Sequence, residues 1–285
     1  MMNLSTLKTL FLATVFMLFG CLAIQAADEG LVTKQITIKL DEAGTLPNRI
    51  GESKKYLITN LKIVGEVNGT DWRIIREMAG CDYEGEKTGG KLSILDLSDA
   101  KIVKGGSEYV FFGYDSSRRY TSNDKLGDYA FYGCSGLTSL TIPSSVTSIG
   151  SEAFSGCSGL TSLTIPSSVT SIGNYALKGC SGLTSIYVYP EKLPKLGEKV
   201  FDGCNAKNCK VYVPTGTYDD YWLSEFGYFE NIVEFDATGI DKVTTSTDAK
   251  EVSRYSVNGQ RLSAPAKGLN IVKYSDGSVK KVVVL

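Results

Sequence analysis

Cysteine is the residue of this 285-residue sequence with the most scope for chemistry, because there are seven cysteines and no histidine. The lack of histidine removes the commonest general base, the Ser-His and Cys-His nucleophile pairs and most catalytic zinc sites. No two cysteines have the CxxC spacing of a zinc or redox site. Four of them recur at steps of 23, 23 and 24 residues: Cys134, Cys157, Cys180 and Cys204. This spacing is compatible with a disulfide framework, but it favours buried thiols at the same position of successive structural repeats.

The charge balance excludes further classes of function. Lys and Arg number 30 against 31 Asp and Glu, so a net charge of −1 provides no field for non-specific binding to nucleic acid or to a membrane surface. A hydrophobic fraction of 42% is enough for a folded core. The sequence contains no clustered acidic pair of a hydrolase, and we expect no catalytic residues, no metal and no cofactor.

The N-terminus predicts export. Lys8 precedes an apolar run over residues 10–24, which is too short for a comfortable membrane span and ends in small residues, as in a secretory signal. We expect cleavage between Ala26 and Ala27, which would remove Cys21 and leave six cysteines. The alternative is lipidation of Cys21. Both predict a chain that is secreted or held at the cell surface or outer membrane.

A repeat occupies the middle of the chain. The blocks Cys134–Gly150 and Cys157–Gly173 are identical, and both read CSGLTSLTIPSSVTSIG. The period of about 23 residues contains L-x-x-L-x-L, seen as Leu137-x-x-Leu140-x-Ile142. A fixed period of 20 to 29 residues with this pattern predicts an α/β leucine-rich-repeat solenoid with a parallel β-sheet and a short helical or irregular convex side.

The alternation within one repeat predicts which side chains face the core. Leu140 and Ile142 are expected to point inward, and Ser139 and Thr141 outward. Pro143 lacks an amide hydrogen and is expected to end the strand. Because a single coil cannot bury its apolar residues alone, stacked coils are expected to share one core.

Degenerate repeats extend the predicted solenoid over residues 36–235. Upstream, residues 58–63 and 92–97 fit the strand template, and between them Thr70 or Asp71 could cap a helix with Trp72 on its apolar face. The aromatic residues of segment 218–235 are expected to close the far end. The predicted domains are a signal peptide (1–26), an N-terminal cap with degenerate repeats (27–125), the regular repeats with a C-terminal cap (126–235), a linker (236–250) and a small all-β module (251–285).

The all-β module is predicted from turn signals between apolar runs. Asn258-Gly259 and Asp276-Gly277 are typical of hairpin turns, and about four strands fit into the segment. A module of this size is only marginally stable alone.

The repeat AFxGCSGLTSLTIPSSVTSIG resembles the BspA-like leucine-rich-repeat surface proteins of Gram-negative host-associated anaerobes. The segments LKIVGEVNGTDWRIIREMAG and LSILDLSDAKIV resemble the N-terminal repeat of that family, and RYSVNGQRLSAPAKGLNIVKYSDGSVKKVVV resembles the C-terminal sorting-type tails of such exported proteins. The resemblance implies a solenoid that binds host proteins or acts as an adhesin, and a tail read by export or sorting machinery. Asn270 departs from the usual aromatic in the tail, which leaves open whether the tail is removed or retained.

The outward face of the predicted sheet is the first candidate binding surface. Rows of hydroxyls flanked by tyrosines could bind protein backbone or glycan by hydrogen bonding and stacking, although Ser and Thr also simply suit parallel strands. The residues of this face are Ser139, Thr141, Ser162, Thr164, Ser185, Tyr187, Lys210 and Tyr212.

The second candidate is an insert over residues 107–125, predicted to be a long irregular loop. Aromatic and arginine side chains on such a loop are typical of interface hot spots, but the aromatics could instead pack the loop onto the cap. The residues are Tyr109, Phe111, Tyr114, Arg118, Arg119 and Tyr120.

Together these features predict an exported or surface-displayed binding protein without catalysis, most simply an adhesin for a host or neighbour-cell protein such as an extracellular-matrix component. A carbohydrate-binding accessory protein is the alternative, and a structural envelope protein is a third interpretation.

Overall fold

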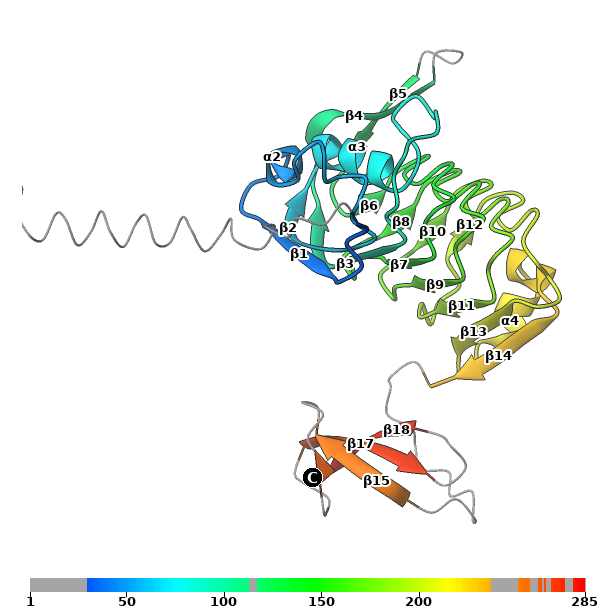
Figure 1. Ribbon diagram of the computed structural model, residues 1–285. Helices are drawn as coiled ribbons and strands as arrows, with labels where there is room; N and C mark the ends of the chain where they lie inside the picture. The colour runs from blue at the N-terminus through cyan, green and yellow to red at the C-terminus, as the bar shows by residue number, and fades with distance from the viewer. Residues whose placement is uncertain are drawn as a thin grey trace, which may run out of the picture. The chain divides into compact units, whose positions relative to one another are not determined.

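The structure is a computed structural model, and it describes residues 30–112, 117–236, 251–256, 261–262, 264, 268–274 and 279–284. Its main element is an eight-stranded parallel sheet in which successive coils of the chain lie side by side (Figure 1). The strands are, in spatial order, β1 (Ile36–Leu40), β2 (Asn60–Val67), β3 (Ile94–Ile102), β7 (Ser139–Thr141), β9 (Ser162–Ile165), β11 (Ser185–Val188), β13 (Lys210–Pro214) and β14 (Asn231–Phe235). The chain therefore folds as the predicted leucine-rich-repeat solenoid.

A second, short parallel sheet lies on another side of the coils. Each coil contributes two residues to it, and these short strands were not predicted from the sequence. Backbone pairs such as Ser148 with Ser171 hold it together, so these strands exist only because neighbouring coils stack. The strands are β6 (Lys125–Leu126), β8 (Ser148–Ile149), β10 (Ser171–Ile172) and β12 (Lys195–Leu196).

The core lies between the two sheets. Leu140 and Ile142 point inward from the main sheet as predicted, and Ile149 points inward from the short sheet. Phe131 and Phe154 of successive coils stack with ring centroids 5.8 Å apart and planes 7° apart. The repeat thus builds one continuous core, because equivalent side chains lie on top of one another from coil to coil.

The N-terminal cap contains helices α2 (Leu46–Arg49) and α3 (Gly69–Met78). The cap residue of α3 is Asn68, and the prediction of Thr70 or Asp71 as the cap was wrong. Asn68 is in an extended conformation and its side chain accepts a hydrogen bond from the Thr70 amide, while the Asp71 carboxylate accepts one from the Asn68 amide.

Arg76 of helix α3 links this cap to the first regular coil. Its guanidinium is fully buried and donates hydrogen bonds to the carbonyls of Asp82, Tyr129, Ala130 and Tyr132 at 2.8–3.3 Å. Carbonyl acceptors rather than a carboxylate therefore satisfy this buried charge.

The insert predicted as an irregular loop forms an antiparallel pair of strands, β4 (Gly105–Phe112) and β5 (Ser117–Thr121). The prediction missed this pairing because the pattern of the segment is irregular: its register shifts between Gly105 and Val110. The pair projects from the body of the solenoid, beside helix α3 (Figure 1).

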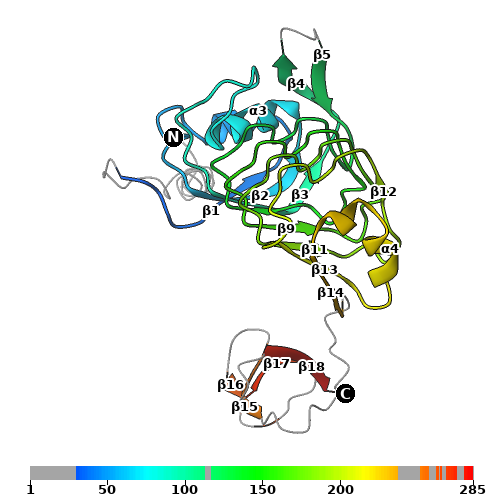
Figure 2. The same cartoon turned by 90° about the vertical axis from the view of Figure 1, so that its right-hand side faces the viewer.

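Aromatic residues pack together at the far end of the solenoid. Helix α4 (Tyr218–Trp222) and the 3-10 helix η1 (Glu225–Tyr228) connect β13 to β14 (Figure 2). Phe226 and Phe229 are fully buried and their rings contact the ring of Phe201, at centroid distances of 4.8 and 4.9 Å.

The C-terminal module is an antiparallel sheet in the order β16-β15-β17-β18, in agreement with the predicted all-β module. Its strands are β15 (Glu251–Ser256), β16 (Arg261–Leu262), β17 (Gly268–Tyr274) and β18 (Val279–Val284). The predicted signal segment with Cys21, Ala26 and Ala27, the linker beyond Asp236 and both predicted hairpin turns lie outside the described residues. Within the described residues, no helix is long and apolar enough to cross a membrane.

Candidate binding surface

The register of the main sheet places the predicted face in two straight rows. Ser139 pairs with Ser162, Ser162 with Ser185 and Ser185 with Lys210, so these residues form one row across four strands. The second row contains Thr141, Thr164, Tyr187 and Tyr212. All eight side chains are exposed or half-buried, whereas the residues between them are buried. Sheet register therefore brings the eight predicted residues onto one face.

The hydroxyls of this face are available for a ligand. In the described part of the chain, Ser139, Thr141, Ser162, Thr164 and Ser185 form no side-chain hydrogen bond with another protein group. The threonines that precede the strands behave differently: Thr161 Oγ1 donates to the Thr138 carbonyl and Thr184 Oγ1 to the Thr161 carbonyl, each at 3.0 Å. Thus the hydroxyls of these threonines link successive coils, whereas the outward hydroxyls do not take part in such links.

An aromatic cluster ends the face on its C-terminal side. Tyr187 and Tyr212 stack with ring centroids 4.6 Å apart and planes 6° apart. Phe235 of the last strand makes edge contacts with both of them, and with Tyr189 at 5.2 Å. Sequence reasoning missed Phe235, because β14 follows two helical turns and no longer keeps the period of the repeat. It also missed Tyr189, which directly follows β11 and joins the cluster through its contact with the Phe235 ring.

A charged group ends the face on its N-terminal side. Lys62 of β2 forms ion pairs with Asp96 at 3.1 Å and Asp99 at 2.7 Å, both on β3. Hydrogen bonds from Lys62 to Asp99 and Asp96 raise the pKa of the lysine. The row that contains Thr141 continues directly into this group, since Asp96 pairs with Thr141 and with Lys62. This extension could have been found by aligning residues 58–63 and 92–97 with the repeat.

The candidate residues of the insert lie in different environments on the hairpin of β4 and β5. Tyr109 is 2% exposed, and its hydroxyl donates to the Asp128 carbonyl at 2.8 Å, so it packs in the core. Arg118 lies over the ring of Phe111 and forms an ion pair with Glu108 at 3.0 Å. Arg119 lies over the ring of Tyr129 on the body of the solenoid. Tyr120 is 51% exposed, and Tyr114 lies outside the described residues.

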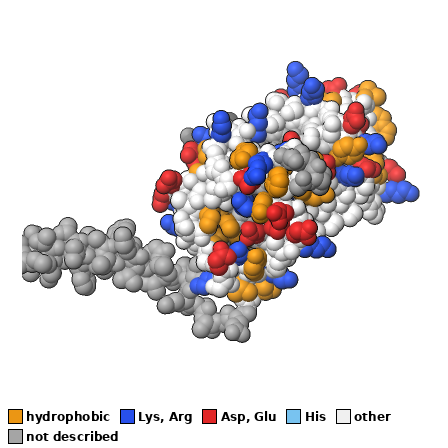
Figure 3. All heavy atoms as spheres, turned by 90° about the horizontal axis from the view of Figure 1, so that it is seen from above, with side chains coloured by type: hydrophobic (Ala, Val, Ile, Leu, Met, Phe, Trp, Pro, Cys, Tyr) orange, Lys and Arg blue, Asp and Glu red, His pale blue; other side chains and the backbone are white. Residues whose placement is uncertain are grey.

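The side of the molecule seen in Figure 3 carries charges of both signs, scattered among hydrophobic and uncharged atoms. The hairpin is therefore not part of a surface with one dominant charge. Unlike the two rows of the sheet, its candidates are mostly engaged with the protein itself.

The repeated cysteines occupy one buried ladder. Cys134, Cys157, Cys180 and Cys204 are buried free thiols, and Cys157 Sγ, Cys180 Sγ and Cys204 Sγ each contact a carbonyl of the preceding coil at 3.0–3.2 Å. Burial raises the pKa of Cys134 and of Cys204 to about 12 and the pKa of Cys157 well above its ordinary value. Neutral, enclosed thiols are poor nucleophiles and poor metal ligands.

Cys81 and Cys209, which the repeat does not explain, are also buried free thiols. Burial raises the pKa of both, and that of Cys209 reaches about 12. In the described part of the chain, no three Cys, Asp or Glu residues come together as a metal site.

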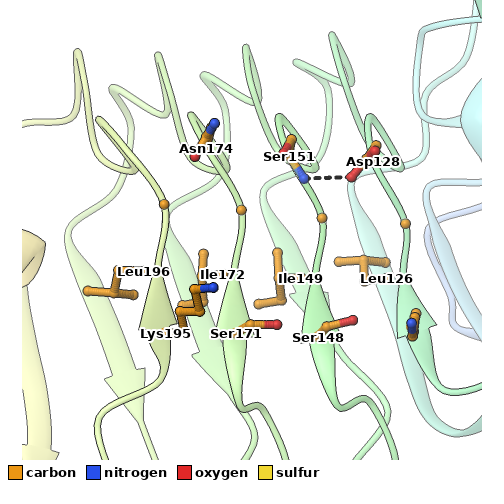
Figure 4. A pocket seen from close by; sticks show the side chains of 15 residues that line it. Leu126, Asp128, Ser148, Ile149, Ser151, Ser171, Ile172, Asn174, Lys195 and Leu196 are labelled. Atoms are coloured by element: carbon orange, nitrogen blue, oxygen red, sulfur yellow. Dashed lines mark hydrogen bonds between the residues drawn. The ribbon is translucent and has the colours of Figure 1, made fainter.

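A groove of about 500 Å³ crosses the short sheet. Ser148, Ser171 and Lys195 lie along one side of it and Asp128, Ser151 and Asn174 along the other (Figure 4). Glycine lines it in every coil, because a Cβ at Gly150 would collide with the backbone of Gly127 and Asp128. The close approach of successive coils explains the glycines that line this groove.

Stacked coils, a parallel sheet with one solvent-facing side and a single shared core define the chain as a leucine-rich-repeat solenoid. Residues 109–224 match the family model described as a BspA type leucine-rich repeat region, in six copies. The repeat region of the chain therefore belongs to the BspA type.

A solved structure with similarity to the chain is the crystal structure of a leucine-rich repeat protein from Bacteroides ovatus ATCC 8483. It is 22% identical, with a TM-score of 0.34, and the match covers 71% of this chain and 42% of that one. The chain thus spans less than half the length of that protein. No curated protein matches the chain.

Proposed function

We propose that the chain is an exported, non-catalytic binding protein that holds a partner protein on the outer face of its main sheet. The observation that carries this proposal is the group of five outward hydroxyls without a hydrogen-bond partner among the described residues. They lie between the charged group at Lys62 and the aromatic cluster at Tyr187. Hydrogen-bonding groups beside aromatic anchors are typical of protein interfaces.

The arrangement of the tyrosines favours protein over carbohydrate as the partner. A sugar ring binds aromatic side chains by lying on an exposed ring face. Tyr187 and Tyr212 each cover one ring face of the other, and Phe235 makes edge contacts with both. These contacts leave fewer ring faces for a sugar than two separate exposed tyrosines would, which favours a protein partner.

The biological role that we propose is adhesion to a host or neighbour-cell protein, such as a component of extracellular matrix. The predicted signal segment and the BspA type of the repeats support export to the cell surface or medium, and the predicted tail would be read by sorting machinery. The buried, neutral thiols support a role without catalysis. A carbohydrate-binding accessory protein and a structural envelope protein are the alternatives.

The test removes hydroxyls without changing the shape of the strands. Binding of the Thr141→Val/Thr164→Val variant is compared with wild type on a panel of immobilised matrix proteins and on a glycan array. Two lost hydrogen bonds should weaken binding to the recognised matrix protein by about tenfold or more. The Ser148→Ala/Ser171→Ala variant removes two hydroxyls from the short sheet and should bind like wild type.

Two results would contradict the proposal. One is matrix-protein binding that both pairs of substitutions leave unchanged, which would move the interface away from the main sheet. The other is binding to glycans alone that is lost in Tyr187→Ser/Tyr212→Ser, which would favour the carbohydrate-binding alternative.

A further inference from the structure

The C-terminal end of the solenoid exposes an apolar patch that the proposed function does not use. Helix α4 and the residue after it present Tyr218, Trp222 and Leu223, which are 39%, 45% and 83% exposed. The rings of Tyr218 and Trp222 are parallel to within 7° and their centroids are 6.2 Å apart. Large side chains exposed together on one short element mark a contact surface.

The patch lies in the most acidic part of the solenoid. Residues 211–236 contain six Asp and Glu and no Lys or Arg, in a chain whose net charge is only −1. Asp219 and Asp220 are exposed on the same helix, and Glu225 and Glu230 follow it. Within the described residues, none of these four carboxylates forms an ion pair. The surface therefore suits an apolar and cationic occupant.

The C-terminal module has the complementary composition. Residues 251–285 contain six Lys and Arg against two Asp and Glu. In the antiparallel register of β17 and β18, positions 269, 271, 273, 281 and 283 lie on one face of the sheet. Positions 269, 271 and 283 hold Leu, Ile and Val, and positions 273 and 281 hold Lys.

The small size of the module also favours packing against another surface. It is a four-stranded sheet within 35 residues, and its described part contains no disulfide. Sheets of this size are marginal in water unless they pack against something else. Residues 237–250 connect it covalently to the strand next to the patch, so docking within one chain does not depend on the protein concentration.

We propose that the C-terminal module docks in cis on the α4 patch, with its lysines beside Asp219 and Asp220 and its apolar face on Trp222. This inference is independent of the proposed function, because the patch lies outside the two rows of the main sheet. Docking would cover the acidic end of the solenoid and stabilise the module.

Tryptophan fluorescence tests the docking in the full chain. The chain has two tryptophans, of which Trp72 is 1% exposed and Trp222 lies in the patch, so acrylamide quenching reports mainly on Trp222. Quenching of wild type at low salt should be about twofold weaker than that of Lys273→Glu/Lys281→Glu, and salt should remove the difference. The control Lys192→Glu/Lys195→Glu makes the same charge change on the solenoid and should behave like wild type.

A second variant separates docking from folding of the module. Asp219→Asn/Asp220→Asn leaves the module unchanged and should raise quenching as much as the lysine reversal does. Equal quenching of wild type and both variants at low salt would overturn the proposal. Protection of Trp222 that grows with protein concentration would also overturn it, because the occupant would then be a second copy of the chain.

Discussion

At the scale of single residues, the buried thiols have a measurable effect on stability. Six cysteines are buried without a disulfide, and burial raises the pKa of each thiol above its ordinary value. In the unfolded chain a cysteine ionises near pH 9. Since the folded state keeps the proton and the unfolded state releases it, the stabilisation is complete below pH 9 and is lost as the pH rises above it.

We therefore predict that the free energy of unfolding falls steeply above pH 9, and that Cys157→Ala makes this fall shallower. Each thiol removed should reduce the slope by about 1.4 kcal/mol per pH unit. Urea unfolding at several pH values between 8 and 11 measures the slope. The exposed neighbour Ser158 provides the control, since Ser158→Ala should leave the slope unchanged. An unchanged slope in Cys157→Ala would show that ionisation of this thiol is not linked to unfolding.

At the scale of the element, each coil contains a turn with an unfavourable backbone conformation. Tyr129, Glu152, Tyr175 and Lys199 have φ values of +48° to +57°, and they occupy the same station in successive coils. Residues other than glycine disfavour this left-handed region, because their Cβ atom crowds the backbone. The recurrence shows that coil geometry imposes the conformation, whichever residue the sequence supplies.

The prediction for this turn is a stabilising substitution. Glu152→Gly should raise the free energy of unfolding by about 0.5–1 kcal/mol, because glycine adopts a positive φ without a steric cost. Ser144 is exposed and does not have a positive φ, so Ser144→Gly should instead destabilise the protein slightly. Chemical denaturation of the two variants in parallel checks both signs, and a loss of stability in Glu152→Gly would contradict the argument.

The same elements show what sequence could and could not predict. The alternation of Leu140 and Ile142 with Ser139 and Thr141 was enough to place the main sheet and its hydroxyl rows. The short strand at Ser148 and the positive φ at Glu152 were not predictable, because both arise only when coils stack. The aromatic cluster was half predicted, since Tyr187 and Tyr212 keep the repeat register whereas Phe235 reaches the face after an irregular connection.

At the scale of the whole molecule, the solenoid is a stack of coils that are coupled only to their nearest neighbours. Each coil contacts its two neighbours, so its contribution to stability is the sum of its own folding and two interfaces. The repeat spacing is 23 residues between equivalent positions such as Cys134 and Cys157. A whole coil can therefore be removed without changing the register of those that remain.

We predict that deletion of residues 151–173 yields a folded protein that is one coil shorter. Strand β7 would then pair with β11, and Ser139 would lie opposite Ser185. Circular dichroism should keep its shape, and unfolding should stay cooperative with a lower free energy. Deletion of residues 151–170 removes most of a coil but breaks the register, and this variant should fail to fold. Equal stability of the two deletions would contradict the stacked-coil description.

The identity of the blocks Cys134–Gly150 and Cys157–Gly173 has a consequence for inheritance. Neighbouring identical tracts are where copying and recombination of DNA gain or lose whole units. Each unit gained would add one strand, about 4.8 Å of sheet, and one more pair of outward hydroxyls. A lineage carrying this chain could thus alter the span of its surface in single genetic events, without altering the side chains at either end.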